Sequence, residues 1–339
     1  GKAALYKYQF VGDLGSTVVK EVEKTAVSLR LGDLLASGDP SPLFEGLLDR
    51  TLDRDGHSAP LFIGATAGVR DGLVQGRISQ DAVDAFKDAL LARYGETVRM
   101  EVLSSAREAA LELAAVRFAF QNLAVKRAGK EEELVVSFSG GGMSCQIAWS
   151  DKAADGFVSM DLDLFAAQRV FDAVGEDEAL KWWSNHIHSE TRRVLDETLV
   201  GGKLIGGGGD ILVVGITMMA SAADQAGVGH RLVGIDELVD ACEALIRHAL
   251  ARDSWWTEFV QAADTNGQNK YGLDAETFRK VMILSTMRLQ GVVQVAFMPV
   301  KHVQFFMSRT NQISESQSVG PVNVEWPLGA VMSTDWNLR

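Results

Sequence analysis

Residues 133–149 read Glu-Leu-Val-Val-Ser-Phe-Ser-Gly-Gly-Gly-Met-Ser-Cys-Gln-Ile-Ala-Trp. A β-branched run enters three consecutive glycines, Gly140, Gly141 and Gly142, and a second short apolar run, residues 146–149, leaves them. This pattern predicts a β-hairpin whose tip lacks side chains, so that backbone N–H groups can face an anion directly. Glycine triplets also occur at ordinary hairpin turns, so the pattern alone does not identify a ligand site.

A second turn of similar kind lies near the N-terminus, where residues 12–17 read Gly-Asp-Leu-Gly-Ser-Thr. Each half of the chain opens with strands around a glycine turn and closes with helices. Two such loops could hold one polyphosphate between them. Because no long repeat exists at the residue level, the duplication is inferred from topology alone.

The length of 339 residues suits two domains rather than one compact core. A charge-rich break at residues 126–133 marks the expected boundary. We therefore expect an α/β protein with an N-terminal domain over residues 1–130, a C-terminal domain over 131–315 and the ligand in the cleft between them. Residues 316–339 are expected to pack back across that cleft.

Hydrophobic periodicity predicts the individual elements. Three strands, over residues 4–13, 17–24 and 26–31, are expected to form a meander at the N-terminus. The wholly apolar residues 60–64 predict a strand covered on both faces. A long helix is expected over residues 106–128, and residues 291–299 are expected to form a buried strand.

The composition is that of an ordinary globular protein, with 47% hydrophobic and 23% charged residues. The net charge of -12 argues against a nucleic-acid or anionic-membrane surface, which would need clustered Lys and Arg. A phosphate ligand would instead be held by loop amides or by a bound cation, for which Mg²⁺ or Ca²⁺ is the simplest choice.

The cellular setting is expected to be a reducing compartment, cytoplasmic or organellar. Cys145 and Cys242 are too few for a disulfide framework, although one bridge between them stays open. The longest apolar run, residues 211–223, is too short to span a bilayer, so we expect a soluble protein without a transmembrane segment. Residue 1 is Gly rather than Met, so trimming is expected and a targeting segment could have been removed.

Five short motifs, in chain order, resemble those of the apyrase-type nucleoside phosphatases and their relatives, the exopolyphosphatases and guanosine pentaphosphate phosphohydrolases. The motifs are Asp-Leu-Gly-Ser-Thr (13–17), Gly-Ala-Thr-Ala-Gly-Val-Arg (64–70), Leu-Ser-Ser-Ala-Arg-Glu-Ala (103–109), Ser-Gly-Gly-Gly-Met-Ser-Cys-Gln-Ile (139–147) and Glu-Trp-Pro-Leu-Gly-Ala (325–330). Residues 204–210 and 230–238 are similar to the corresponding stretches of the exopolyphosphatases. The resemblance spans nearly the whole chain, and only the second motif is specific alone.

This resemblance implies the fold of actin, the sugar kinases and the heat-shock ATPases, with two ribonuclease H-like domains and an interdomain cleft. It also implies attack of a water molecule on a terminal phosphoryl group, with Glu108 as the base, Asp13 near the cation and Trp326 at the nucleotide. The phosphate-binding residues that it implies are Gly15, Ser16, Thr17, Thr66, Arg70, Gly140, Gly141, Gly142, Ser144 and Gln146.

Each of these roles has a plainer alternative. Glu108 begins a helix, where a carboxylate interacts favourably with the helix macrodipole. Asp13 fits an ordinary turn at a strand end. Arg70 fits a residue that caps a surface helix.

The fourth motif departs from the family at the ligand-facing positions. The family has Asp-[Leu/Ile]-Gly-Gly there, and the Asp helps to hold the metal, but this chain has Ser139 at that position. A hydroxyl brings no charge, so metal affinity and turnover should both fall. Ser105 stands where Gly is usual and Cys145 where Thr is usual. This pattern is typical of a degenerate member.

Two functions follow from these observations. The first is a phosphoanhydride hydrolase that binds a nucleotide or polyphosphate together with a divalent cation. The second is a catalytically impaired pseudoenzyme that serves as a structural or regulatory subunit of a larger, organellar assembly with protein partners. A sugar or acetate kinase ranks below both, because the second and third motifs favour hydrolase relatives.

Overall fold

The computed structural model describes residues 3–11, 18–27, 30–39, 41–49, 61–96, 98–126, 134–150, 155–198, 211–265, 273–300, 302–308 and 324–332. The chain divides into two compact units. Unit 1 contains residues 1–120 and 310–339, and unit 2 contains residues 121–309. The first boundary falls inside a helix, whereas the charge-rich break predicts it at residue 130.

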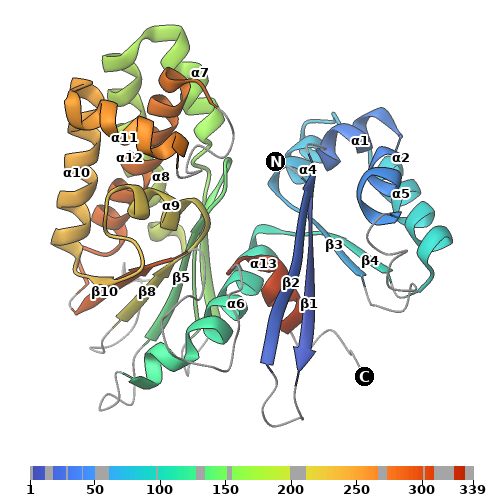
Figure 1. The fold of residues 1–339 in the computed structure, drawn as a ribbon. Coiled ribbons are helices and arrows are strands. Elements are labelled where there is room, and N and C mark those ends of the chain that lie inside the picture. Colours follow the sequence, from blue (N-terminus) through green and yellow to red (C-terminus); the bar gives the residue numbers. More distant parts are fainter. Residues whose placement is uncertain are drawn as a thin grey trace. The chain divides into compact units, whose positions relative to one another are not determined.

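Unit 1 contains two small sheets (Figure 1). Strands β1 (Ala3–Val11) and β2 (Val18–Val27) form an antiparallel pair whose register shifts between Lys7 and Tyr8. Strands β3 (Leu61–Ala65) and β4 (Val98–Val102) pair in parallel, with Ala65 opposite Val102. The carboxyl ends of β3 and β4 therefore lie side by side, at the edge where ligands bind in parallel α/β sheets.

The helices of unit 1 follow the strands closely. They are α1 (Leu31–Ser37), α2 (Ser41–Leu43) with a π-helical turn at Phe44–Leu48, α4 (Ala67–Val74), α5 (Gln80–Tyr94), α6 (Ser105–Lys126) and α13 (Trp326–Met332). Helix α5 shows why they form: the Oγ of Ser79 accepts from the amide of Ala82 at its N-terminus, and Val83, Phe86 and Leu90 follow at helical spacing and are buried.

The predicted N-terminal meander is wrong in its third strand. Ala26 and Val27 belong to β2 and Leu31 begins α1, while residues 28 and 29 lie outside the described residues. Helix α1 buries the side chain of Leu35 in the core. Gly38 ends this helix in the left-handed conformation. An apolar segment this short does not distinguish a strand from the first turn of a helix.

Unit 2 is built on a six-stranded sheet with the order β7-β6-β5-β8-β10-β9. The strands are β5 (Leu134–Gly140), β6 (Cys145–Ser150), β7 (Asp155–Met160), β8 (Ile211–Gly215), β9 (Leu232–Val233) and β10 (Val303–Met307). Strands β5, β8 and β10 run parallel, and the other pairings are antiparallel. All five residues of the central β8 are buried, as its wholly apolar sequence predicts.

Six helices complete the described part of unit 2. They are α7 (Leu164–Val174), α8 (Glu176–Thr198), α9 (Thr217–Gln225), α10 (Ile235–Ala251), α11 (Ser254–Thr265) and α12 (Ala275–Ala296). Helix α12 packs against α7, α8, α9 and α10. Because it is surrounded, its C-terminal half is apolar on several faces, and the strand predicted over residues 291–299 is wrong: residues 291–296 are helical.

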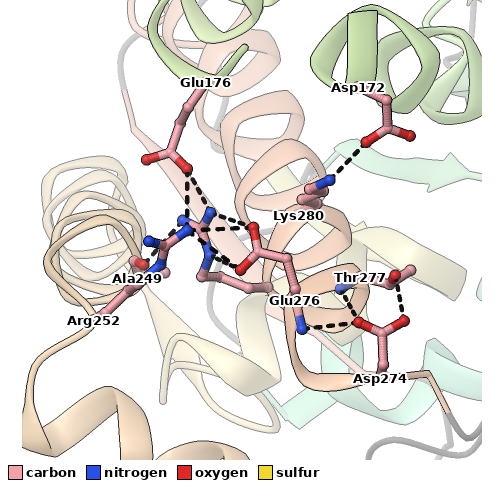
Figure 2. Close-up of polar contacts among 9 residues, drawn as sticks. Asp172, Glu176, Ala249, Arg252, Asp274, Glu276, Thr277 and Lys280 are labelled. Atoms are coloured by element: carbon pink, nitrogen blue, oxygen red, sulfur yellow. Dashed lines mark hydrogen bonds and ion pairs between the residues drawn. The ribbon is translucent and has the colours of Figure 1, made fainter.

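An ion-pair network fixes the N-terminal turn of α12 (Figure 2). The guanidinium of Arg279 is almost fully buried and donates to both carboxylate oxygens of Glu276, at 2.7 and 3.0 Å, and to Glu176 at the start of α8. Its third nitrogen donates to the Ala249 carbonyl of α10 at 3.3 Å. Every nitrogen of this arginine therefore has an acceptor, and three helices meet at it.

Neither Cys145 nor Cys242 forms a disulfide, and both are buried. Among the described helices, none combines the length and the apolar character that a membrane crossing needs.

Candidate functional site

The first candidate site joins Arg70 and Glu108 at the carboxyl ends of β3 and β4. Thr66 follows β3 and is the N-cap of α4, so Arg70 lies in the first turn of that helix. Glu108 lies in the first turn of α6, three residues beyond the start of that helix at Ser105 and shortly after β4. Arg70 Nη1 donates to Glu108 Oε2 at 2.8 Å and also to the carbonyl of Leu103. The structure thus brings two of the predicted site residues into direct contact.

The environment of Glu108 changes its acidity. Its side chain is only 13% exposed, and burial raises the pKa of this carboxyl, while the hydrogen bond and charge of Arg70 act to lower it. The net effect is a pKa above the ordinary glutamate value. A carboxylate of raised pKa beside a cation can accept a proton from water, which is the property that a general base needs.

Another residue predicted for the site, Trp326, packs inside unit 1. Its ring lies edge-on to Phe62, with centroids 6.2 Å apart, and covers Gly64, where an added Cβ would stand 2.5 Å from the indole. Three residues further along α13, Gly329 lies so close to α6 that an added Cβ would stand 1.7 Å from the carbonyl oxygen of Leu111. The Trp-Pro-Leu-Gly-Ala motif therefore anchors α13, and nucleotide binding by Trp326 stays a prediction.

The second candidate site is the hairpin tip between β5 and β6. The amide of Gly140 donates to Thr217 Oγ1 at 3.0 Å, and the amide of Gly141 donates to the carbonyl of Ser144 at 2.9 Å. Within the described part of the chain, the amides of Gly142, Met143 and Ser144 donate to no other group. The predicted loop exists, but its first two amides are already bonded within the protein, that of Gly140 to α9 and that of Gly141 inside the hairpin.

Polar side chains behind the tip form a chain of hydrogen bonds. Gln146 Nε2 donates to Ser144 Oγ at 2.7 Å, and Gln146 Oε1 accepts from Ser139 Oγ at 3.3 Å. Ser139 is 1% exposed, so its hydroxyl lies in the interior, where it donates to Gln146. Gln146 therefore positions Ser144, and Ser139 supplies no charge to the surface of the loop.

Two residues at this loop do not belong to any of the five motifs. Thr217 at the start of α9 adopts φ +55° and holds Gly140 through its hydroxyl. Arg288, in the middle of α12, approaches the other side of Gly140: an added Cβ there would stand 3.1 Å from Arg288 Nη2 and 2.6 Å from the terminal methyl of Met219. The sequence signal for Arg288 is that it is the single charged residue in a helical stretch, residues 281–296.

The donors at the second loop do not fit a divalent cation. Mg²⁺ and Ca²⁺ prefer carboxylate oxygens, whereas this loop offers hydroxyls, an amide side chain and a guanidinium. Over the described residues, no group of three or more His, Cys, Asp or Glu gathers at one place. The remaining predicted ligands, Asp13, Gly15, Ser16 and Thr17, lie outside the described residues.

Comparison with solved structures places the fold. A type II variant of the Aquifex aeolicus Ppx/GppA phosphatase matches with a TM-score of 0.58 and 12% identity, over 98% of this chain and 95% of that one. Another structure of the Aquifex aeolicus member of that family matches with a TM-score of 0.57 and 13% identity, over 98% and 93%. A structure described as an exopolyphosphatase-like protein gives 0.54 and 14%, over 94% and 91%.

No protein-family profile matches the sequence, and no curated protein matches it. The likeness is therefore one of fold, and it extends over nearly the full length of both chains. The predicted α/β architecture is confirmed: this chain has the fold of the Ppx/GppA phosphatases, with two actin-like, ribonuclease H-like domains.

Proposed function

We propose that this protein binds a phosphoanhydride, either polyphosphate or a nucleoside polyphosphate, and hydrolyses its terminal phosphoryl group with Glu108 as the base. The observation that supports this proposal is the pair of Arg70 and Glu108 at the carboxyl ends of adjacent parallel strands. Glu108 has a raised pKa and can take a proton from the attacking water, and Arg70 can contact a phosphoryl oxygen.

The experiment is an assay of phosphate release from nucleoside di- and triphosphates and from polyphosphate, with and without Mg²⁺ or Ca²⁺. The wild type is compared with Glu108→Gln, which is expected to lower the rate about 100-fold or more. Glu178→Gln is the matched control, because Glu178 is an exposed glutamate in the first turn of another long helix, α8. It removes a macrodipole interaction without touching the site, so its rate should equal that of the wild type.

Equal background rates for the wild type and Glu108→Gln would contradict the hydrolase proposal. They would favour the second candidate, a non-catalytic subunit of a larger assembly. The observation that favours this alternative is Ser139, a buried hydroxyl where the fourth motif has a carboxylate. Ser139→Asp separates the two: a gain in metal-dependent phosphate release would show that catalysis lacks only this charge, and no gain would support the subunit.

A further inference from the structure

Arg288 is the most unusual charged residue in unit 2. Its side chain is fully buried, and Nη1 donates to the carbonyl of Leu162 at 3.0 Å. Among the residues that the structure describes, its Nε and Nη2 have no hydrogen-bond partner. A buried donor without an acceptor is destabilising, and more so when it is charged, so such a group calls for a missing partner.

The charge on Arg288 persists at neutral pH. Burial lowers the pKa of the guanidinium to about 10, and the side chains of Cys145 and Asp163 act in the opposite direction. Asp163 is engaged elsewhere, because it caps α7 by accepting from the amide of Phe165 at 2.8 Å. The interior beside the second loop therefore carries a full positive charge, and no carboxylate forms a hydrogen bond with it.

The unpaired nitrogen lies directly under the loop. Gly140 has no side chain, and the space that a Cβ would need is occupied by Arg288 Nη2 and the Met219 methyl. On the outer side, Gly141 is exposed, and the amides of Gly142, Met143 and Ser144 donate to no group in the described part of the chain. The loop amides and the guanidinium beside Gly140 are both hydrogen-bond donors without partners among the described residues, and both kinds of donor favour a negatively charged ligand.

We propose that Arg288 makes the loop of residues 140–144 an oxyanion site that works without a metal ion. The guanidinium supplies, from inside the protein, the positive charge that a bound cation would bring, and the ligand is a phosphate or the terminal phosphoryl group of a phosphoanhydride. This deepens the proposed function by resting on its phosphate binding, but it does not depend on hydrolysis.

The test is isothermal titration calorimetry of the full chain with inorganic phosphate as the probe, first in EDTA and then in Mg²⁺. We expect the wild type to bind phosphate equally in both. Arg288→Met should weaken binding about tenfold or more, which corresponds to about 1.4 kcal/mol. Arg288→Lys keeps the charge and should therefore lose less of the affinity for phosphate than Arg288→Met does. Arg169→Met removes an exposed arginine of α7 and should bind as the wild type does.

Gly140→Ala provides a second variant that keeps the arginine. Its methyl group would force Met219 and the guanidinium to move, so phosphate binding should weaken while circular dichroism stays unchanged. The inference is overturned if wild-type binding requires Mg²⁺, if no phosphate binds in EDTA, or if folded Arg288→Met binds as the wild type does. Phosphate binding without any phosphate release would contradict the hydrolase proposal and leave this inference standing.

Discussion

Arg279 and Arg288 lie on the same helix, α12, and both are buried, yet their surroundings differ completely. Every nitrogen of Arg279 has an acceptor, and its two glutamate partners tie α8 to α12. Arg288 has one acceptor and two unpaired nitrogens beside a glycine loop. The difference shows that burial of a charge does not define its role: Arg279 holds three helices together, whereas the described contacts of Arg288 leave most of its hydrogen-bonding groups unused, which is why we propose a ligand for it. The contact between Arg70 and Glu108 is intermediate: the two charges pair with each other, but they do so at a candidate ligand site.

The largest effect is expected for Arg279→Met. It removes the contacts with Glu176, Glu276 and Ala249, and it leaves the two carboxylates with the more exposed Arg252 as their cation, so the free energy of unfolding should fall by about 3 kcal/mol. This change in the free energy of unfolding is measured by urea denaturation. Tryptophan fluorescence reports the transition, because Trp183 and Trp256 are buried in unit 2 and become exposed on unfolding. Lys280→Met is the control: its ion pair with Asp172, at 2.6 Å, is much more exposed and should contribute about 1 kcal/mol or less (Figure 2).

The next effect concerns the contact between Arg70 and Glu108, whose side chains are 19% and 13% exposed. A double-mutant cycle of Arg70→Met and Glu108→Gln should give a coupling energy of about 2 kcal/mol, because the hydrogen bond is charge-assisted and largely shielded from water. A coupling energy near zero would mean that the two residues act independently and that Glu108 is not held in place by Arg70.

Arg288→Met should change stability in the opposite direction. Replacing a buried, unsatisfied guanidinium by an apolar side chain of similar length should raise the free energy of unfolding by about 1 kcal/mol, even after loss of the contact with Leu162. The same urea titration tests this. A loss of stability comparable to that of Arg279→Met would make Arg288 a structural arginine and remove the contrast between the two.

The smallest effect is a dependence on pH. Because the folded state raises the pKa of Glu108 above its ordinary value of 4.5, the folded protein retains this proton longer than the unfolded chain. The contribution of Glu108 to stability is therefore complete below pH 4.5 and is lost as the pH rises through the folded-state pKa. Relative to Glu108→Gln, the wild type should become less stable over that interval. A difference that grows in favour of the wild type would contradict the raised pKa.

The sequence predicts most of the fold, because its elements are long and strongly periodic. The helix α6 and the strands β3 and β5 lie where periodicity and glycine turns place them. The two errors have one physical cause. Residues 26–31 and 291–299 are short apolar segments, and a helix buried on several sides loses the polar face that would distinguish it from a strand.

The candidate site is predictable only where motifs mark it. Glu108, Arg70 and the Gly140 loop belong to motifs, and the structure brings the first two together. Arg288 and Thr217 reach Gly140 from α12 and α9, more than 70 residues away in the chain. Local pattern carries no information about such a contact. A charged residue in a helix is also expected on its exposed face, so the sequence alone would place Arg288 in solvent.

Gly329 has a consequence for the order in which the protein folds. Its close approach to Leu111, and the hydrogen bond from Tyr6 to Glu325 at 2.6 Å, join the first and last parts of the chain within unit 1. All of unit 2 lies between them in the sequence. During synthesis, all of unit 2 is therefore made before the final helix of unit 1. Unit 1 begins first, but it can complete its fold only after unit 2 has been synthesised.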